Sequence, residues 1–261
     1  MTKRLATLMY HELSRPGEPL CESDRGYAKY AVDGGLFGEH MQRLATEGFQ
    51  GVSVSRALAD ADDSATVAVS FDDGCATDLT IAAPALARLG FTATSYVTTG
   101  FLGRRGFLTP SLLRELADAG AEIGSHAVTH RFLTDLSDSD LTSEVADSRH
   151  QLEQIIGRPV THFSCPGGRF DRRVVDAVRR AGYTSMATSR IGLHEPGGDV
   201  FNLPRIVVTA GATAEYVASV SRGQGLATRR LRSAVLDAAK AMLGNRVYVA
   251  LRAVTFGDRS R

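Results

Sequence analysis

The 261-residue chain contains no tryptophan and only three cysteines, and aromatic residues make up 7% of it. Three widely spaced cysteines, Cys21, Cys75 and Cys165, do not predict a disulfide framework. No apolar stretch is long enough to cross a bilayer, and the first residues lack the apolar core and cleavage site of a signal peptide. We therefore expect a cytoplasmic protein that forms one sizeable hydrophobic core.

Neither sign of charge dominates, because the chain contains 30 lysines and arginines and 29 acidic residues. The exception is residues 222–261, where basic residues greatly outnumber Asp237 and Asp258. We expect a basic helical extension at residues 216–261 that packs on the body or meets an anionic surface. Basic residues cluster nowhere else and no known reader motif appears, which argues against nucleic-acid binding.

Strand-like and helix-like segments alternate from residue 5 to about residue 216. Repeated units of this length predict a parallel sheet flanked by helices, and glycines that follow the helical segments supply stop signals. The helical candidates are residues 36–46, 76–89, 110–119, 138–156 and 172–181. The strand candidates are residues 5–10, 66–71, 92–97, 123–125, 161–164 and 205–209.

The most informative segment is Val-Ser-Phe-Asp-Asp-Gly at residues 69–74. A run rich in β-branched residues ends there in two adjacent carboxylates, Asp72 and Asp73. Both lie at the C-terminal end of a buried strand, where parallel α/β folds carry their chemistry. Neighbouring side chains at a strand end point in different directions, so one acid can hold a metal while the other handles a proton.

Two histidines, His126 and His130, follow another strand end. On a helical turn their spacing of four would put both imidazoles on one face. Two histidines and a carboxylate form a common site for a divalent ion that keeps positions open for water. We therefore expect Asp73, His126 and His130 to meet at one edge of the sheet. Such donors accept zinc, cobalt, nickel or iron.

At these residues the chain resembles the polysaccharide deacetylases of carbohydrate esterase family 4. Its first motif is similar to residues 70–74 and its second to residues 125–130. The third, usually Arg-x-Pro-Tyr-Gly, corresponds to Ser-Cys-Pro-Gly-Gly at residues 164–168. The resemblance covers roughly residues 5–209, and it implies a distorted (β/α)7-type barrel, which we place at residues 1–215.

The resemblance also implies an activity: a metal-dependent hydrolase that removes N-acetyl or other small N-acyl groups from an amino sugar. By similarity, Asp72 is the general base, and Asp73, His126 and His130 hold a divalent ion, with zinc favoured over cobalt, nickel or iron. The backbone N–H of Gly167 would help to hold the oxyanion by analogy. The implied partner is an N-acetylated sugar in a glycan, a lipid-linked saccharide or a small glycoside.

The first strand ends in Met-Tyr-His at residues 9–11. This looks like a subgroup that deacetylates exopolysaccharides and takes its acid histidine from the N-terminal end, which makes His11 the implied general acid. His194 is a second candidate acid, in a glycine-rich loop at residues 192–199. We expect this loop, like the polar segment 14–35, to lie at the strand-end face and border the cleft.

The third motif departs from the family pattern, because Ser164 replaces its arginine and Gly167 its tyrosine. Arg205 is a candidate substitute for the arginine. Two other functions stay open: a metal-free amidohydrolase acting on a cyclic amide, and a non-catalytic sugar-binding barrel. The retained metal-ligand pattern argues against the first, and the altered third motif supports the second. The basic C-terminal helix could bring the chain to a membrane or a lipid-linked substrate.

Overall fold

The structure is a computed structural model that describes residues 4–23, 25–59 and 65–226. The chain up to Gly223 forms one compact unit. The predicted basic extension at residues 216–261 lies mostly outside the described residues, so its helical character and its contacts stay predictions. Within the described part of the chain, no helix is long and apolar enough to span a membrane.

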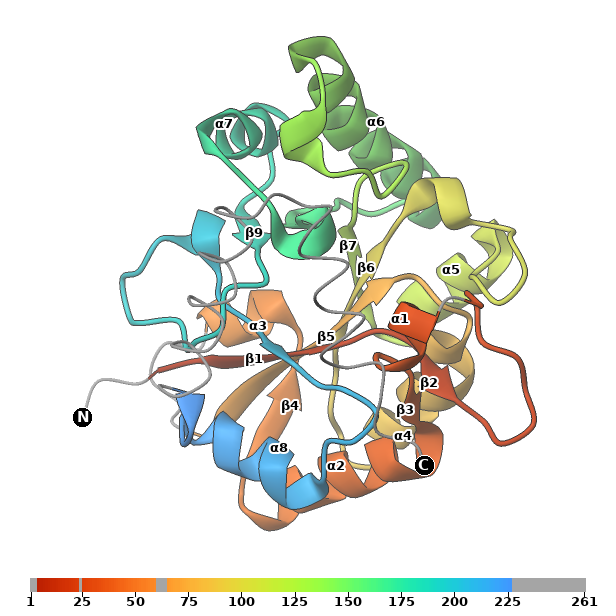
Figure 1. Cartoon of the computed structure of the whole chain (residues 1–261), viewed down its shortest axis with the longest axis vertical. Helices are drawn as coiled ribbons and strands as arrows, with labels where there is room; N and C mark the ends of the chain where they lie inside the picture. Colours follow the sequence, from red (N-terminus) through yellow and green to blue (C-terminus); the bar gives the residue numbers. More distant parts are fainter. Residues whose placement is uncertain (1–3, 24, 60–64, 227–261) are drawn as a thin grey trace. The chain divides into compact units, whose positions relative to one another are not determined.

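One curled sheet of eight parallel strands forms the centre of the unit (Figure 1). Its order is β10-β1-β5-β6-β7-β8-β9, and β4 also pairs with β5. Because all strands run the same way, their C-terminal ends share one edge, as expected for a (β/α) barrel. The strands are β1 (Ala6–Tyr10), β4 (Gln50–Val52), β5 (Thr66–Asp73), β6 (Thr94–Val97), β7 (Glu122–Ser125), β8 (His162–Ser164), β9 (Ser185–Ala187) and β10 (Ile206–Val207).

Strand β5 is the longest strand of the sheet, and all eight of its residues are buried. It pairs with β1 along one side and with β4 and then β6 along the other. Its register with β6 sets Asp72 opposite Tyr96 and Asp73 opposite Val97. The two carboxylates are therefore fixed at the end of a strand that has partners on both sides.

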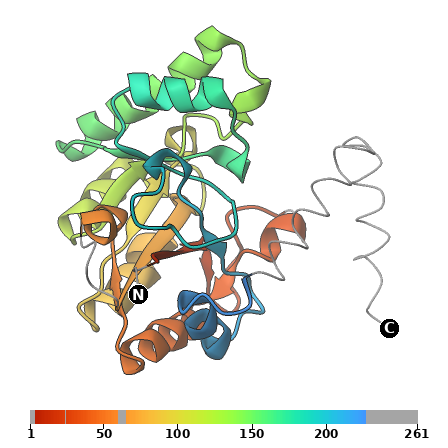
Figure 2. The same cartoon turned by 90° about the vertical axis from the view of Figure 1, so that its left-hand side faces the viewer.

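Helices lie outside the sheet, as the alternating sequence pattern predicts (Figures 1 and 2). Helices α2 and α8 pack together, as do α6 and α7. The bounds of α6 match the prediction, because Ser137 caps its first turn and Gly157, at φ 66°, ends it. The helices are α1 (Arg25–Ala28), α2 (Gly34–Thr46), α3 (Val54–Ala59), α4 (Ala83–Ala87), α5 (Pro110–Asp118), α6 (Asp138–Ile156), α7 (Arg172–Arg180) and α8 (Ala214–Ser221).

Two segments differ from the sequence-based expectation. The helix predicted at residues 76–89 is instead a π-helical turn, Asp78–Ala82, followed by the short α4. Pro84 accounts for the change, because it has no N–H to donate to the preceding turn. The polar segment 14–35 contains α1 and a small parallel pair, β2 (Leu13–Ser14) with β3 (Val32–Asp33).

Candidate active site

The carboxylate of Asp72 is paired with an arginine from the far end of the described chain. Arg205 Nη1 and Nη2 donate to Asp72 Oδ1 and Oδ2, both at 2.7 Å, and both residues are at least 97% buried. Burial alone would raise the pKa of Asp72, but the guanidinium of Arg205, helped by His126, holds it well below its ordinary value. Asp72 is therefore ionised at neutral pH.

Ser164, at the end of β8, explains how Arg205 reaches this position. Arg205 Nη2 donates to Ser164 Oγ at 2.8 Å, and Ser164 Oγ donates to Asp72 at 3.3 Å. The short serine side chain stands where the family motif has its arginine, and it leaves room for a guanidinium that enters just before β10. The structure thus places Arg205 in the role suggested for it from the sequence.

Asp73 points toward two imidazoles. Its Oδ1 lies 3.4 Å from His130 Nε2 and 3.7 Å from His126 Nε2. This oxygen is buried, and it has no hydrogen-bond partner among the residues that the structure describes. Asp73 also has a φ of 79°, which is unfavourable for a residue with a side chain. An unpartnered buried oxygen on a strained residue is typical of a position that awaits a ligand.

The two histidines meet through a loop and not on a helix, so the predicted helical turn is wrong. The backbone reverses at Ala127, with a φ of 63°, and at His130, with a φ of 61°. Glu144 of α6 stabilises this loop by accepting hydrogen bonds from the backbone N–H groups of Val128 and Thr129, each at 2.9 Å. Helix α6 thus supplies a carboxylate acceptor for two loop N–H groups that would otherwise lack one.

Both imidazoles are arranged to offer a lone pair. His126 Nδ1 donates to the backbone oxygen of Ser164 at 2.8 Å, which leaves Nε2 as the acceptor facing Asp73. Burial lowers the pKa of His126 to about 3 and also lowers the pKa of His130, so both rings are neutral at pH 7. Burial raises the pKa of Asp73 to about 6, while the charge of His11 opposes this shift and Asp72 adds to it.

These three residues fit a divalent cation. Their donor atoms all lie within 4.8 Å of one another. Nitrogen and oxygen ligands about 2.1 Å from one ion would lie about 3.4 Å apart in a tetrahedral arrangement, close to the separations that Asp73 Oδ1 makes with the two imidazoles. A cation there would also satisfy the unpartnered oxygen of Asp73 and stabilise its charged form.

His11 faces the same space from the end of β1. Its ring stacks on Tyr30 with centroids 4.8 Å apart, and its buried Nδ1 has no hydrogen-bond partner within the described ranges. The shared cavity measures about 440 Å³, within the usual range for ligand pockets. Its lining includes all six predicted site residues, namely His11, Asp72, Asp73, His126, His130 and Gly167, together with Met9, Gly26, Tyr27, Tyr30, Ser189, Ile191 and Val207.

Gly167 is the position where the family motif has a tyrosine. Its φ is +62°, and a Cβ added there would lie 2.4 Å from the ring carbon Cε1 of Phe132. A side chain would therefore clash with this ring and strain the backbone. Phe132, which follows the histidine loop and is 41% exposed, occupies the space beside Gly167 at the rim of the site.

The two predicted loops differ in their outcome. The segment 14–35 borders the cavity as expected, because Tyr27 and Tyr30 line it. The expectation for residues 192–199 is wrong, since His194 exchanges two backbone hydrogen bonds of 2.9 Å with Leu5. Leu5 precedes β1, so this loop lies at the opposite edge of the sheet from Asp72, and His194 is no longer a candidate acid.

Two residues that shape the site were missed by sequence reasoning. A signal existed for Glu144, because this acid lies on the helical stripe formed by Leu141, Val145 and Ser148, where an apolar or small residue is expected. No sequence signal marked Tyr30 as the partner of the His11 ring, since their stacking depends on the path of the whole segment 14–35.

Comparisons with known sequences agree with the motifs. A family model described as polysaccharide deacetylase matches residues 59–186. The Bacillus subtilis protein YxkH, whose name assigns it to the polysaccharide deacetylases, is 28% identical over 213 residues, covering 80% of this chain and 72% of that protein. A peptidoglycan-N-acetylglucosamine deacetylase of Bacillus cereus is 28% identical over 123 residues, covering 47% of this chain and 56% of that protein.

Solved structures share the fold. The deacetylase PplD of Streptococcus pyogenes, solved with acetate, superposes with a TM-score of 0.73 at 24% identity, covering 83% of this chain and 97% of that one. IcaB from Ammonifex degensii gives a TM-score of 0.72 at 22% identity, covering 84% and 97%. The curled parallel sheet described above is therefore the fold of these proteins.

Proposed function

The chain belongs to the polysaccharide deacetylase family, and from that premise we propose that it is a metal-dependent hydrolase that removes N-acetyl groups from amino sugars. One observation carries the proposal. Three donor atoms, from Asp73, His126 and His130, converge on one point beside an ionised Asp72, and all four residues line one cavity. This combination supplies a cation site and a proton acceptor side by side.

Asp73, His126 and His130 would hold the divalent ion, and zinc fits this donor set well. When bound, the ion would act as a Lewis acid that polarises the acetyl carbonyl and makes water more acidic. His126 is fixed for this task by its bond to the Ser164 carbonyl. Outer partners of this kind commonly set the tautomer and orientation of a ligating imidazole.

Asp72 accepts the proton of the attacking water. Arg205 donates to both carboxylate oxygens and Ser164 donates a further hydrogen bond, which leaves about one of the roughly four lone-pair sites to the water. The paired guanidinium also returns Asp72 to its ionised form after each turnover, because it lowers the pKa of that carboxylate. Arg205 is thus a positioning residue that acts through Asp72.

His11 protonates the departing amine nitrogen, because an amide anion is too basic to leave. Its ring is held by Tyr30, and its Nδ1 is free of a partner within the described chain. The backbone N–H of Gly167 would hold the developing oxyanion, and one such donor stabilises the transition state by about 3 kcal/mol. Acid–base help of this type accelerates a reaction by about 10²–10⁴-fold.

The substrate class follows from the cavity and the relatives. Members of this family act on acetylated polysaccharides, and the Bacillus cereus relative is named for N-acetylglucosamine in peptidoglycan. The cavity is large enough for a sugar unit, and among the residues that the structure describes, the acidic and basic side chains that line it are the site residues named above. We propose an N-acetylated glycan, with lipid-linked saccharides and small glycosides as further substrates to test. A cytoplasmic location stays a prediction.

The decisive experiment measures amine release from a panel of N-acetylated glycans, glycolipids and small glycosides, with and without a chelator. We expect release that the chelator abolishes and a divalent ion restores. Asp72→Asn should lower the rate by about 10²–10⁴-fold while the protein still binds the metal. Asp147→Asn, an exposed acid on α6, is the matched control.

Three results would contradict the proposal. Undiminished release by Asp72→Asn would exclude this residue as the base. Chelator-resistant release would favour a metal-free amidohydrolase. If the wild-type protein binds N-acetylated sugars but releases no amine from any of them, the sugar-binding function would replace the enzymatic one.

A further inference from the structure

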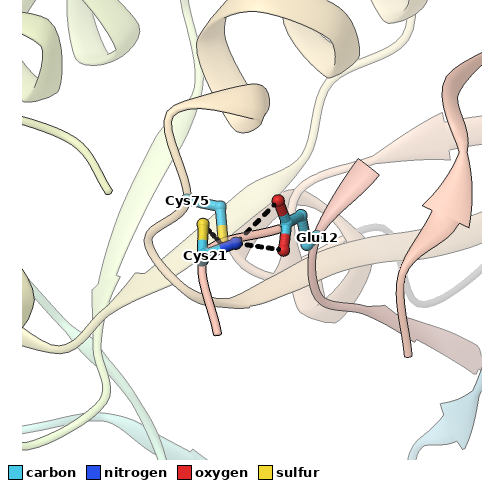
Figure 3. Close-up of side chains that lie close together, drawn as sticks. All are labelled: Glu12, Cys21 and Cys75. Atoms are coloured by element: carbon cyan, nitrogen blue, oxygen red, sulfur yellow. Dashed lines mark hydrogen bonds between the residues drawn. The ribbon is translucent and has the colours of Figure 1, made fainter. Parts of the chain in front are cut away.

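Cys21 and Cys75 form a close thiol pair behind the active site. Their sulfurs lie 3.5 Å apart, although 54 residues separate them in the sequence. Both residues are buried, Cys21 at 8% exposure and Cys75 at 0%. Figure 3 shows the two side chains pointing toward each other, with Glu12 on the far side of the Cys21 backbone nitrogen.

The pair connects two segments that build the cavity. Cys75 follows Asp73 by two residues, at the end of β5, and Cys21 belongs to the segment 14–35. The same segment brings Tyr27 into the cavity lining, and its hydroxyl lies 3.4 Å from Cys75 Sγ. A bond between the two sulfurs would therefore attach one wall of the cavity directly to the metal-ligand strand.

Neighbouring residues hold Cys21 in position, and the hydrogen bond that its sulfur makes is weak. Both oxygens of Glu12 accept from the backbone N–H of Cys21, at 3.1 and 3.0 Å, which anchors its main chain. The Cys21 thiol donates to the Gly106 oxygen at 3.0 Å, and thiols are weak donors that give up such bonds at little cost. Gly106 leaves the room for this sulfur, since a Cβ there would lie 2.7 Å from it.

We propose that Cys21 and Cys75 form a reversible disulfide that fastens the segment 14–35 to the end of β5. The sulfurs need to approach from 3.5 Å to about 2.05 Å, while Glu12 holds the Cys21 backbone through its N–H. The proposal concerns a modification site, and it does not depend on the proposed hydrolase activity.

The oxidant is a small-molecule disulfide such as oxidised glutathione. The Cys21 thiolate attacks one sulfur of the oxidant, whose S–S bond breaks and releases one thiolate. The Cys75 thiolate then attacks Cys21 Sγ in the mixed disulfide and expels the second thiolate. The two cysteines lose two protons and two electrons in total, and the oxidant becomes two thiols.

Cys165 provides a matched control. It is also buried, but its thiol donates to the backbone oxygen of Arg169 at 2.8 Å and lies in the third motif. All three cysteines are buried, but the short sulfur–sulfur distance belongs to Cys21 and Cys75.

The test treats the purified full-length protein with oxidised glutathione and counts free thiols in denaturant. We expect the count to fall from three to one, the mass to fall by about 2 Da, and dithiothreitol to reverse both changes. Peptide mapping should join Cys21 to Cys75. Cross-linking residues 54 apart should raise the melting temperature by about 5–10 °C.

Cysteine variants distinguish a Cys21–Cys75 disulfide from other disulfides that oxidation could form. Cys21→Ser and Cys75→Ser should each abolish the thermal shift, whereas Cys165→Ser should retain it. Three free thiols after oxidation, or a disulfide that includes Cys165 or a second chain, would overturn the proposal. The proposal would also fail if the two thiols were bound to a metal together with Glu12. In that case a chelator would restore the free-thiol count without a reductant.

Discussion

Two clusters of potential metal donors lie near the end of β5, where Cys75 of one cluster follows Asp73 of the other by two residues. The two clusters differ in their surroundings. The histidine cluster, Asp73 with His126 and His130, lines the cavity and includes a buried oxygen that has no partner within the described residues. The thiol cluster, Glu12 with Cys21 and Cys75, is equally compact. Its carboxylate and its sulfurs already contact donors or acceptors of the protein.

This comparison shows that proximity and residue type do not by themselves identify a cation site. The histidine cluster is incomplete without a ligand, because desolvated polar atoms that lack partners are unfavourable. The thiol cluster is satisfied in its reduced form, so a metal would have to replace existing hydrogen bonds. We therefore expect the first cluster to bind a divalent ion and the second to undergo thiol chemistry.

The largest expected effect comes from removing a ligand of the histidine cluster. Asp73→Asn should weaken zinc binding by more than about 100-fold, because even the loss of outer partners weakens metal affinity 10–100-fold. Competition with a chromophoric chelator measures the change. Cys21→Ser in the thiol cluster should leave zinc affinity within about twofold. Similar losses in both variants would remove the distinction between the clusters.

A smaller effect is expected when the support of the histidine loop is changed. Glu144→Gln removes the charge of the carboxylate that binds the N–H groups of Val128 and Thr129, and it turns one of its two acceptor oxygens into an amide donor. Zinc affinity should fall by about 10-fold, as for other outer-shell losses, while Asp147→Asn on the same helix should have no effect. Unchanged affinity in Glu144→Gln would mean that the loop keeps its shape without this carboxylate.

The smallest effect concerns pH. Burial raises the pKa of Asp73 to about 6, while it lowers the pKa of His126 to about 3 and also lowers that of His130, so as the pH falls through 6 the ligand whose proton a cation must displace is Asp73. Zinc affinity should therefore fall about tenfold for each pH unit below 6 and level off above it. Titrations at pH 5 and 7 test this expectation. Asp73→Asn should show no such slope, and a slope of two protons would implicate a histidine.

Much of the fold was predictable because long periodic segments carry their own signals. Helix α6 begins and ends where Ser137 and Gly157 indicate. Strands β4 and β9 were missed, because their sequences, Gln-Gly-Val and Ser-Met-Ala, contain few of the β-branched and aromatic residues that mark a strand. The π-helical start of the segment after Cys75 depends on Pro84 and on packing, and a helical pattern could not distinguish it from an α-helix.

The site was predictable where motif residues sit at strand ends, and less so where tertiary contacts decide. Asp72 and Asp73 end β5 and His11 directly follows β1, so the parallel sheet alone brings them to one edge. The histidine loop could not be predicted, because Glu144 of a distant helix binds the N–H groups of the two residues that lie between its left-handed positions. The position of Arg205 required the curl of the sheet, which brings residues 133 apart into contact.

The origin of Arg205 has a consequence for the maturation of the protein. The guanidinium enters from the last strand of the sheet, so a growing or truncated chain that ends before residue 205 contains Asp72 without its counter-ion. A carboxylate buried in that state would retain a proton. A fragment that ends before residue 205 and still buries Asp72 would therefore lack an ionised carboxylate to accept a proton from water.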